Sequence, residues 1–316
     1  MNRWGFFRQG WLFLAIPVLT ESLTTNQSFT QVFSPVGYFF LFFAYCIPVY
    51  LIYVLMVRWD LNVVGVFVLG LAYGIFNEGV LAKTLLMTDQ KVPVTAFAGY
   101  DVWGVNLPWA MVIIFWHACH AVFYPVILAR FLYPTLGRGK DFPRPGLAAA
   151  ACFYLIAGSL FFLVVHKGTD PVYLFIFAAL IIVLIVIARK WPKAWDIDLA
   201  AEHTKSIRHS RSLLVGGAML GLFIIPAIIA SLHWVVPIQA ALTVTIYALF
   251  FLFLKRGQYF QLPNMVFVAL GDYVVYAAAG LMGSLDNMDR LAGEAVAICV
   301  LIILFYLVRK RDRLIG

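Results

Sequence analysis

Residues 171–189 read PVYLFIFAALIIVLIVIAR, and this stretch decides the class of fold. It carries no charge before Arg189, and its apolar side chains leave no polar face. About 20 such residues in an α-helix cross the hydrocarbon core of a bilayer. The stretch therefore predicts a membrane-spanning helix.

The rest of the chain repeats this pattern. Of its 316 residues, 63% are hydrophobic and 12% are charged. A soluble domain is nearer 45–50% apolar and about 25% charged, so lipid must solvate most of this surface. Run lengths predict an all-α polytopic transmembrane bundle of about ten spans. The predicted spans cover residues 10–29, 35–57, 61–86, 104–129, 146–166, 171–189, 212–232, 235–254, 261–283 and 290–308.

The basic residues predict the orientation of these spans. If the N-terminus is cytoplasmic, 19 of the 23 Lys and Arg residues fall in cytoplasmic segments. Lys83, Lys91, Lys167 and Arg290 are the exceptions. Cytoplasmic loops are enriched in Lys and Arg, so both termini are predicted to be cytoplasmic. The net charge of +8 gathers at span ends, which argues against a nucleic-acid partner.

We expect one integral membrane domain over residues 1–316, most simply in a prokaryotic plasma membrane. Residues 1–170 form a five-span part that carries the polar residues, and residues 212–316 form a four-span remainder. Between them, residues 171–211 hold the sixth span and a cytoplasmic loop with Trp191 and Trp195, which suits the membrane interface. The first span is either a retained helix, which we favour, or a signal peptide.

Ionisable side chains inside lipid cost free energy, so each one suggests a function. The candidates are Glu21, Asn77 with Glu78, His117 with His120, and Asp272. A rise of 1.5 Å per residue puts Glu21 and Glu78 about 12 Å, and His117 about 16 Å, below the outer surface. These three side chains are therefore predicted to share one layer in the outer half of the membrane.

Three functions are open for this layer, beside a purely structural Glu–His cluster. Glu78 could act as general base or acid for hydrolysis, with His117 holding the water, Glu21 completing the site, and Asn77, His120 and Asp272 in support. His117, His120 and Glu78 could instead bind Zn²⁺ or another divalent metal. The same acids could bind protons in a ten-span transporter, although the two halves show no matching polar pattern.

Part of the chain resembles a known family of intramembrane proteases. Residues 74–78, Gly-Ile-Phe-Asn-Glu, resemble the first motif of the CAAX-protease and bacteriocin-processing family of glutamate proteases. Glu78 would match its second glutamate, His117 its motif-two histidine, and residues 166–170 loosely its third motif. Asn77 stands where that family has its first glutamate, and Ala82 where it has arginine. The stretch from Pro17 to Pro134 also resembles uncharacterised prokaryotic multi-span proteins.

The resemblance and the shared depth favour a membrane-embedded hydrolase that acts on a lipid or a membrane-embedded peptide. The polar site is expected in the bilayer itself, between helices that are otherwise apolar. The distance between Glu78 and His117 distinguishes the two hypotheses. A pair within hydrogen-bond reach favours the hydrolase over the transporter.

Overall fold

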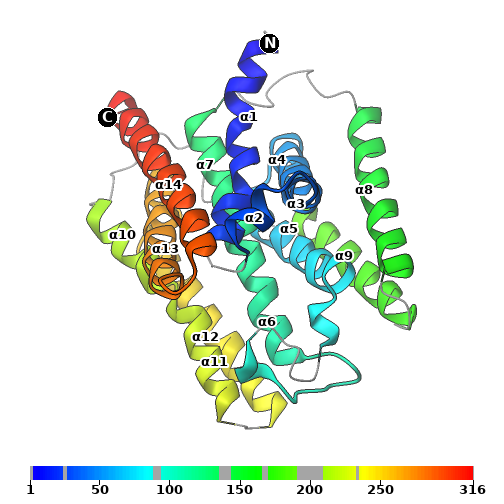
Figure 1. Ribbon diagram of the computed structural model, residues 1–316. Helices are drawn as coiled ribbons and strands as arrows, with labels where there is room; N and C mark the ends of the chain where they lie inside the picture. The colour runs from blue at the N-terminus through cyan, green and yellow to red at the C-terminus, as the bar shows by residue number, and fades with distance from the viewer. Residues whose placement is uncertain are drawn as a thin grey trace.

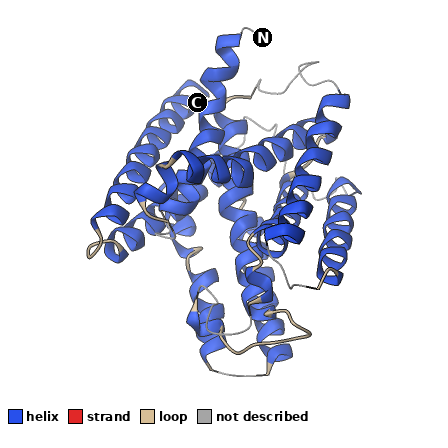
Figure 2. Cartoon of the chain, turned by 45° about the vertical axis from the view of Figure 1, so that its right-hand side comes forward, coloured by secondary structure: helices blue, strands red, loops and turns tan. Residues whose placement is uncertain are grey.

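The computed structural model describes residues 3–23, 27–87, 94–134, 144–165, 170–190, 209–232 and 235–315. Across these segments the structure is helical, and Figure 2 shows helices joined by loops without a strand. Within them, Val102 and Val105 form an isolated β-bridge. The predicted all-α class is therefore confirmed for the part of the chain that is described.

The N-terminal part alternates α-helix with wider π-helical turns. Its elements are α1 (Arg3–Pro17), η1 (Val18–Ser22), α2 (Phe29–Phe33), α3 (Pro35–Leu41), η2 (Phe42–Cys46), α4 (Ile47–Trp59), α5 (Val63–Ile75), η3 (Phe76–Leu81), η4 (Thr84–Leu86), η5 (Thr95–Phe97), α6 (Leu107–Trp116), η6 (His117–Phe123) and α7 (Tyr124–Leu132). Of these, η4 and η5 are short 3-10 turns, and the other η elements are π-helical.

The C-terminal part is built from longer α-helices. These are α8 (Arg144–Val165), α9 (Val172–Lys190), α10 (His209–Ala218), α11 (Gly221–Ser231), α12 (Val236–Arg256), α13 (Leu262–Gly283) and α14 (Met288–Ile315). The predicted interfacial loop falls at residues 191–208, outside the described residues, as do His166 and the next three residues of the loose third motif.

Eight described stretches are long and apolar enough to cross a membrane. They are Pro35–Trp59, Val63–Leu81, Leu107–Leu132, Val172–Lys190, His209–Ser231, Val236–Arg256, Leu262–Gly283 and Met288–Leu314. Two further apolar stretches, Gly10–Ser22 and Ala151–Leu163, are shorter, and they correspond to the first and fifth predicted spans. The structure therefore shows eight candidate spans, where the sequence predicted about ten.

The bundle has a buried centre and a lipid-facing edge. In the most apolar part of the Val63–Leu81 stretch, 89% of the residues are buried. The corresponding share is 17% for Val172–Lys190 and 11% for Val236–Arg256. In Figure 1, α5 lies among other helices, whereas α8 stands at one edge. Figure 1 also places both chain termini toward the same end of the bundle. The apolar exposed faces of α9 and α12 are suited to lipid contact.

Two glycines bring the central helices together. A Cβ atom added to Gly70 would lie 2.9 Å from the Cα atom of Ala118, and one added to Gly74 would lie 2.8 Å from the carbonyl oxygen of Ile114. A larger residue would separate α5 from the α6–η6 helix. Gly70 and Gly74 therefore form a small-residue pair that permits close helix packing.

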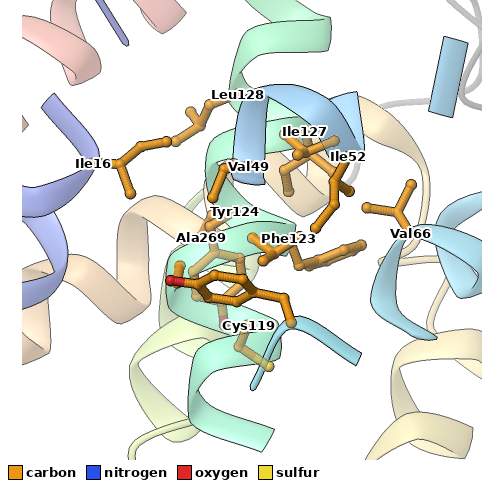
Figure 3. Close-up of a cluster of buried hydrophobic side chains, with 14 of the residues drawn as sticks. Ile16, Val49, Ile52, Val66, Cys119, Phe123, Tyr124, Ile127, Leu128 and Ala269 are labelled. Carbon is orange, nitrogen blue, oxygen red and sulfur yellow. The ribbon is translucent and has the colours of Figure 1, made fainter. Parts of the chain in front are cut away.

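Apolar side chains fill the space around this contact. Figure 3 shows Phe123, Ile127 and Leu128 from η6 and α7 among side chains from other helices. Ile16, Val49 and Val66 contribute from α1, α4 and α5, and each is fully buried. This packed interior fixes the positions of the helices that carry the polar residues.

Prolines explain two of the π-helical turns. Pro48 lies two residues after η2, and Pro125 lies two residues after η6. Proline lacks an N–H and crowds the preceding turn, and a widened turn accommodates that change. The carbonyl of Ala44, four residues before Pro48, accepts instead from the hydroxyl of Tyr73 at 2.9 Å.

Candidate functional site

A cavity of about 600 Å³ lies between the N-terminal helices and residues of α11, α13 and α14. Its walls contain the predicted residues Glu21, Asn77, Glu78 and His117. The other lining residues are Gln27, Phe40, Leu41, Ala44, Tyr45, Leu81, Ala82, Thr84, Val94, Phe97, Trp109, Val112, Ile113, Trp116, Phe223, Ala227, Tyr276 and Arg290. We call this space the polar cavity. Side chains that the sequence analysis placed in one layer therefore line one cavity.

Glu78 and His117 form the centre of the site. Oε1 of Glu78 lies 2.6 Å from Nε2 of His117, and the two side chains come from η3 and η6. The hydroxyl of Thr84 donates to the other carboxylate oxygen. Glu78 and His117 are buried, with 6% and 2% of their surface exposed, and both lie on the cavity wall.

The hydrogen bonds assign a tautomer to His117. The amide nitrogen of Asn77 lies 3.3 Å from Oε1 of Glu78 and 3.2 Å from Nε2 of His117. An ionised carboxylate can only accept, so Nε2 of His117 donates to Oε1 of Glu78, and the Asn77 amide donates to the same oxygen. Nδ1 of His117 then carries the lone pair, and among the described residues it has no hydrogen-bond partner. A carboxylate that orients an imidazole whose other nitrogen is free is the arrangement of a general base.

A second carboxylate lies on the same cavity. Tyr45 donates a short hydrogen bond to Oε1 of Glu21. The ring of Tyr45 also lies 6.0 Å from the ring of His117, and the ring of Tyr73 lies 5.8 Å from it on another side. Glu21 and Glu78 therefore hold separate partners and are connected through the aromatic side chains around His117.

All of these polar residues occupy π-helical turns. Glu21 lies in η1, Tyr45 in η2, Asn77 and Glu78 in η3, and His117 in η6. π-helix is rare in proteins and is frequent at functional sites, because the extra residue redirects side chains. Four π-helical turns in the described chain, all with residues on one cavity, favour a functional site over a chance cluster.

His120 and Asp272 form a separate pair. Nε2 of His120 lies 2.8 Å from Oδ2 of Asp272, and both side chains are almost fully buried. His120 stacks on Trp116 at 4.9 Å and contacts the ring of Tyr276 edge-on at 4.6 Å. Neither His120 nor Asp272 lines the polar cavity. The two histidines therefore face different carboxylates, His117 that of Glu78 and His120 that of Asp272.

The predicted metal site is not assembled. The described residues contain no group of three or more His, Cys, Asp and Glu side chains placed to hold a metal ion. His120 would have to join His117 and Glu78, but its imidazole faces Asp272 on α13. The two histidines belong to two different pairs, and no step of the chemistry below passes through a metal.

Sequence reasoning missed several residues of the site. Tyr45, Thr84, Trp109 and Arg290 line the polar cavity, and the indole of Trp109 donates to the Thr84 hydroxyl at 3.0 Å. Neutral tyrosine and threonine cost little in a membrane helix, so they gave no signal of the kind that marked Glu78. Arg290 did give a signal in the sequence, because it was among the few basic residues outside the predicted cytoplasmic segments.

The fold and this site define a multi-pass α-helical membrane protein with a buried Glu–His cavity. Residues 12–312 match an uncharacterized membrane protein family, and the chain belongs to that family. No curated protein and no solved structure matches the chain. The match covers nearly the whole chain and supports the resemblance to uncharacterised multi-span proteins, whereas nothing in the comparisons supports the glutamate-protease resemblance.

Proposed function

We propose that the polar cavity is the active site of a membrane-embedded hydrolase. The observation that supports this proposal is the 2.6 Å contact between Glu78 and His117 on the wall of a cavity, with Nδ1 of His117 unpartnered among the described residues. The alternative transporter requires groups that bind and release an ion. Here the carboxylate of Glu78 is already held by Thr84, Asn77 and His117.

In the proposed reaction, His117 is the general base and Glu78 orients it. Nδ1 of His117 takes a proton from a water molecule, and the resulting hydroxide attacks the carbonyl carbon or phosphorus of the substrate. His117 then delivers that proton to the leaving group, so the base is regenerated. Glu78 accepts from Nε2–H throughout and stabilises the imidazolium that forms.

Glu21 and Tyr45 complete the cavity wall opposite this pair. Tyr45 is held by Glu21 and packs against the His117 ring, so it limits rotation of the imidazole. We assign both residues to positioning, and neither is a proton carrier in this scheme.

We further propose the ten-span topology for this enzyme, with both termini cytoplasmic. The two shorter apolar helices would add to the eight longer ones, and the two termini point toward the same end of the bundle. An even number of spans agrees with that placement. The charge distribution makes that end cytoplasmic, and a prokaryotic plasma membrane is the expected location.

The test is cleavage by the purified protein of lipid esters and of membrane-embedded peptides. Glu78→Gln and His117→Ala are each expected to lower the rate by about 10²–10⁴, the usual contribution of general acid–base catalysis. Glu294→Gln is the matched control, because Glu294 is a fully buried carboxylate that does not line the polar cavity. Unchanged cleavage in both site variants would exclude this mechanism. Proton- or substrate-driven flux in liposomes that Glu78→Gln abolishes, without cleavage, would favour a transporter.

A further inference from the structure

Arg290 is a cation on the rim of the polar cavity. It lies in the first turn of α14, its side chain is exposed, and it is the only Arg or Lys among the described cavity-lining residues. Its guanidinium has no ion-pair or hydrogen-bond partner in the described part of the chain. A guanidinium at the entrance of a site is suited to a carboxylate or phosphate, which it binds through two parallel hydrogen bonds.

The neighbouring acid does not neutralise this cation. Asp289 accepts from the backbone N–H of Thr30 at 3.0 Å and from the Thr30 hydroxyl at 2.6 Å. These bonds attach the start of α14 to α2, and among the described residues no ion pair joins Asp289 to Arg290. This attachment fixes the position of Arg290, and the positive charge of Arg290 can pair with an anionic ligand.

The remaining wall of the cavity is apolar and reaches the surface of the protein. Phe40 and Val94 are 40% and 41% exposed, and both line the polar cavity. Val112, Phe223 and Ala227 continue the apolar lining inward. In a membrane protein such a wall is open to hydrocarbon chains, because a dry apolar cavity gains dispersion contacts when a chain fills it.

We infer that the polar cavity binds an anionic membrane lipid, with the headgroup paired to Arg290 and a hydrocarbon chain along the apolar wall. The lipid enters from the leaflet at the end where α14 begins. As a statement about the substrate of the Glu78–His117 pair, this inference rests on the proposed function. As a statement about binding, it needs only the cavity and Arg290.

The experiment uses phosphatidylglycerol that carries a photoactivatable diazirine in its acyl chain, with the full-length protein in nanodiscs. Crosslinking followed by peptide mapping should label the segments that contain Phe40, Val94 and Val112. Arg290→Gln should lower labelling about tenfold, because a charge-assisted contact is lost. Arg313→Gln is the matched control, since it removes the same charge from an exposed position at the other end of α14. It should label like the wild type.

Further arms separate the alternatives. Ala227→Phe should reduce labelling by filling the apolar wall, and the phosphatidylcholine analogue should label weakly in the wild type. Inorganic phosphate should not compete, and competition by it would point to a soluble anion instead of a lipid. Equal labelling of wild type and Arg290→Gln, or of the two lipid analogues, would overturn the inference. Normal labelling of a wild type that cleaves neither lipid esters nor membrane-embedded peptides would leave the inference standing and defeat the proposed hydrolase.

Discussion

The protein has two His–carboxylate pairs whose histidines lie on the same helix. The two pairs differ in what surrounds them. Glu78–His117 and Asp272–His120 have similar separations, 2.6 and 2.8 Å, and both histidines lie in η6. The first pair lies on the wall of the polar cavity, whereas His120 is enclosed by the rings of Trp116, Tyr276 and other aromatic residues. The same chemistry therefore serves two purposes, and access to a cavity distinguishes the candidate active site from an internal link between helices.

The largest expected effect tests this distinction through stability. Asp272→Ala leaves His120 buried without its partner, and breaking a buried pair costs about 3–5 kcal/mol. Glu78→Ala should cost clearly less, because the polar cavity can admit water to solvate His117. Denaturant unfolding in detergent micelles measures both variants. Equal losses would show that the two sites are equally closed, and the comparison would fail.

Helix geometry explains how much of the site was predictable. Depth along an α-helix rises evenly, so Glu21, Glu78 and His117 could be placed in one layer from residue numbers alone. The relation between His117 and His120 could not, because residues three apart share a face only in α-helical geometry. Residues 117–123 are π-helical, and the wider turn directs His120 toward Asp272 instead.

The span count shows a similar limit. Composition identified the apolar helices, and the two shorter apolar stretches, Gly10–Ser22 and Ala151–Leu163, lie within the first and fifth predicted spans. Asp272 was misjudged for another reason: its partner His120 is 152 positions away, and only tertiary structure pairs α13 with η6.

A middle-sized effect is expected from the contact between α5 and the α6–η6 helix. Gly74→Val would place a side chain against the backbone of Ile114, and overpacking of this kind costs about 1–3 kcal/mol. It should also separate η3 from η6 and weaken the Glu78–His117 hydrogen bond, so cleavage should fall together with stability. Gly10→Val is the control, since nothing lies within 4 Å of a Cβ atom there. A destabilised Gly74→Val protein that cleaves at the wild-type rate would show that packing and site geometry are separable.

The smallest expected effects come from two tyrosines that satisfy carbonyls near the proline-linked turns. The Tyr73 hydroxyl donates to the carbonyl of Ala44, and the Tyr273 hydroxyl donates to that of His120 at 3.0 Å. In a π-helix the carbonyl of residue 120 would bond to the N–H of residue 125, which is a proline and has none. Tyr273→Phe should cost about 1 kcal/mol, the net contribution of a hydrogen bond, and Tyr73→Phe should cost less, because the Tyr154 hydroxyl also donates to the Ala44 carbonyl at 3.3 Å.

Tyr73→Phe and Tyr273→Phe should differ in their effects on activity. This difference sharpens the comparison of the two His–carboxylate pairs. Tyr73 packs against the ring of His117, so Tyr73→Phe should alter the pH profile of cleavage through the neighbouring imidazole. Tyr273→Phe acts next to the enclosed His120 and should lower the unfolding midpoint without changing that profile. The measurement is the rate of lipid-ester cleavage between pH 5 and 9, with unfolding recorded on the same samples. A shifted profile in Tyr273→Phe would show that the enclosed pair communicates with the cavity, and the two pairs would then have to be treated as one coupled site.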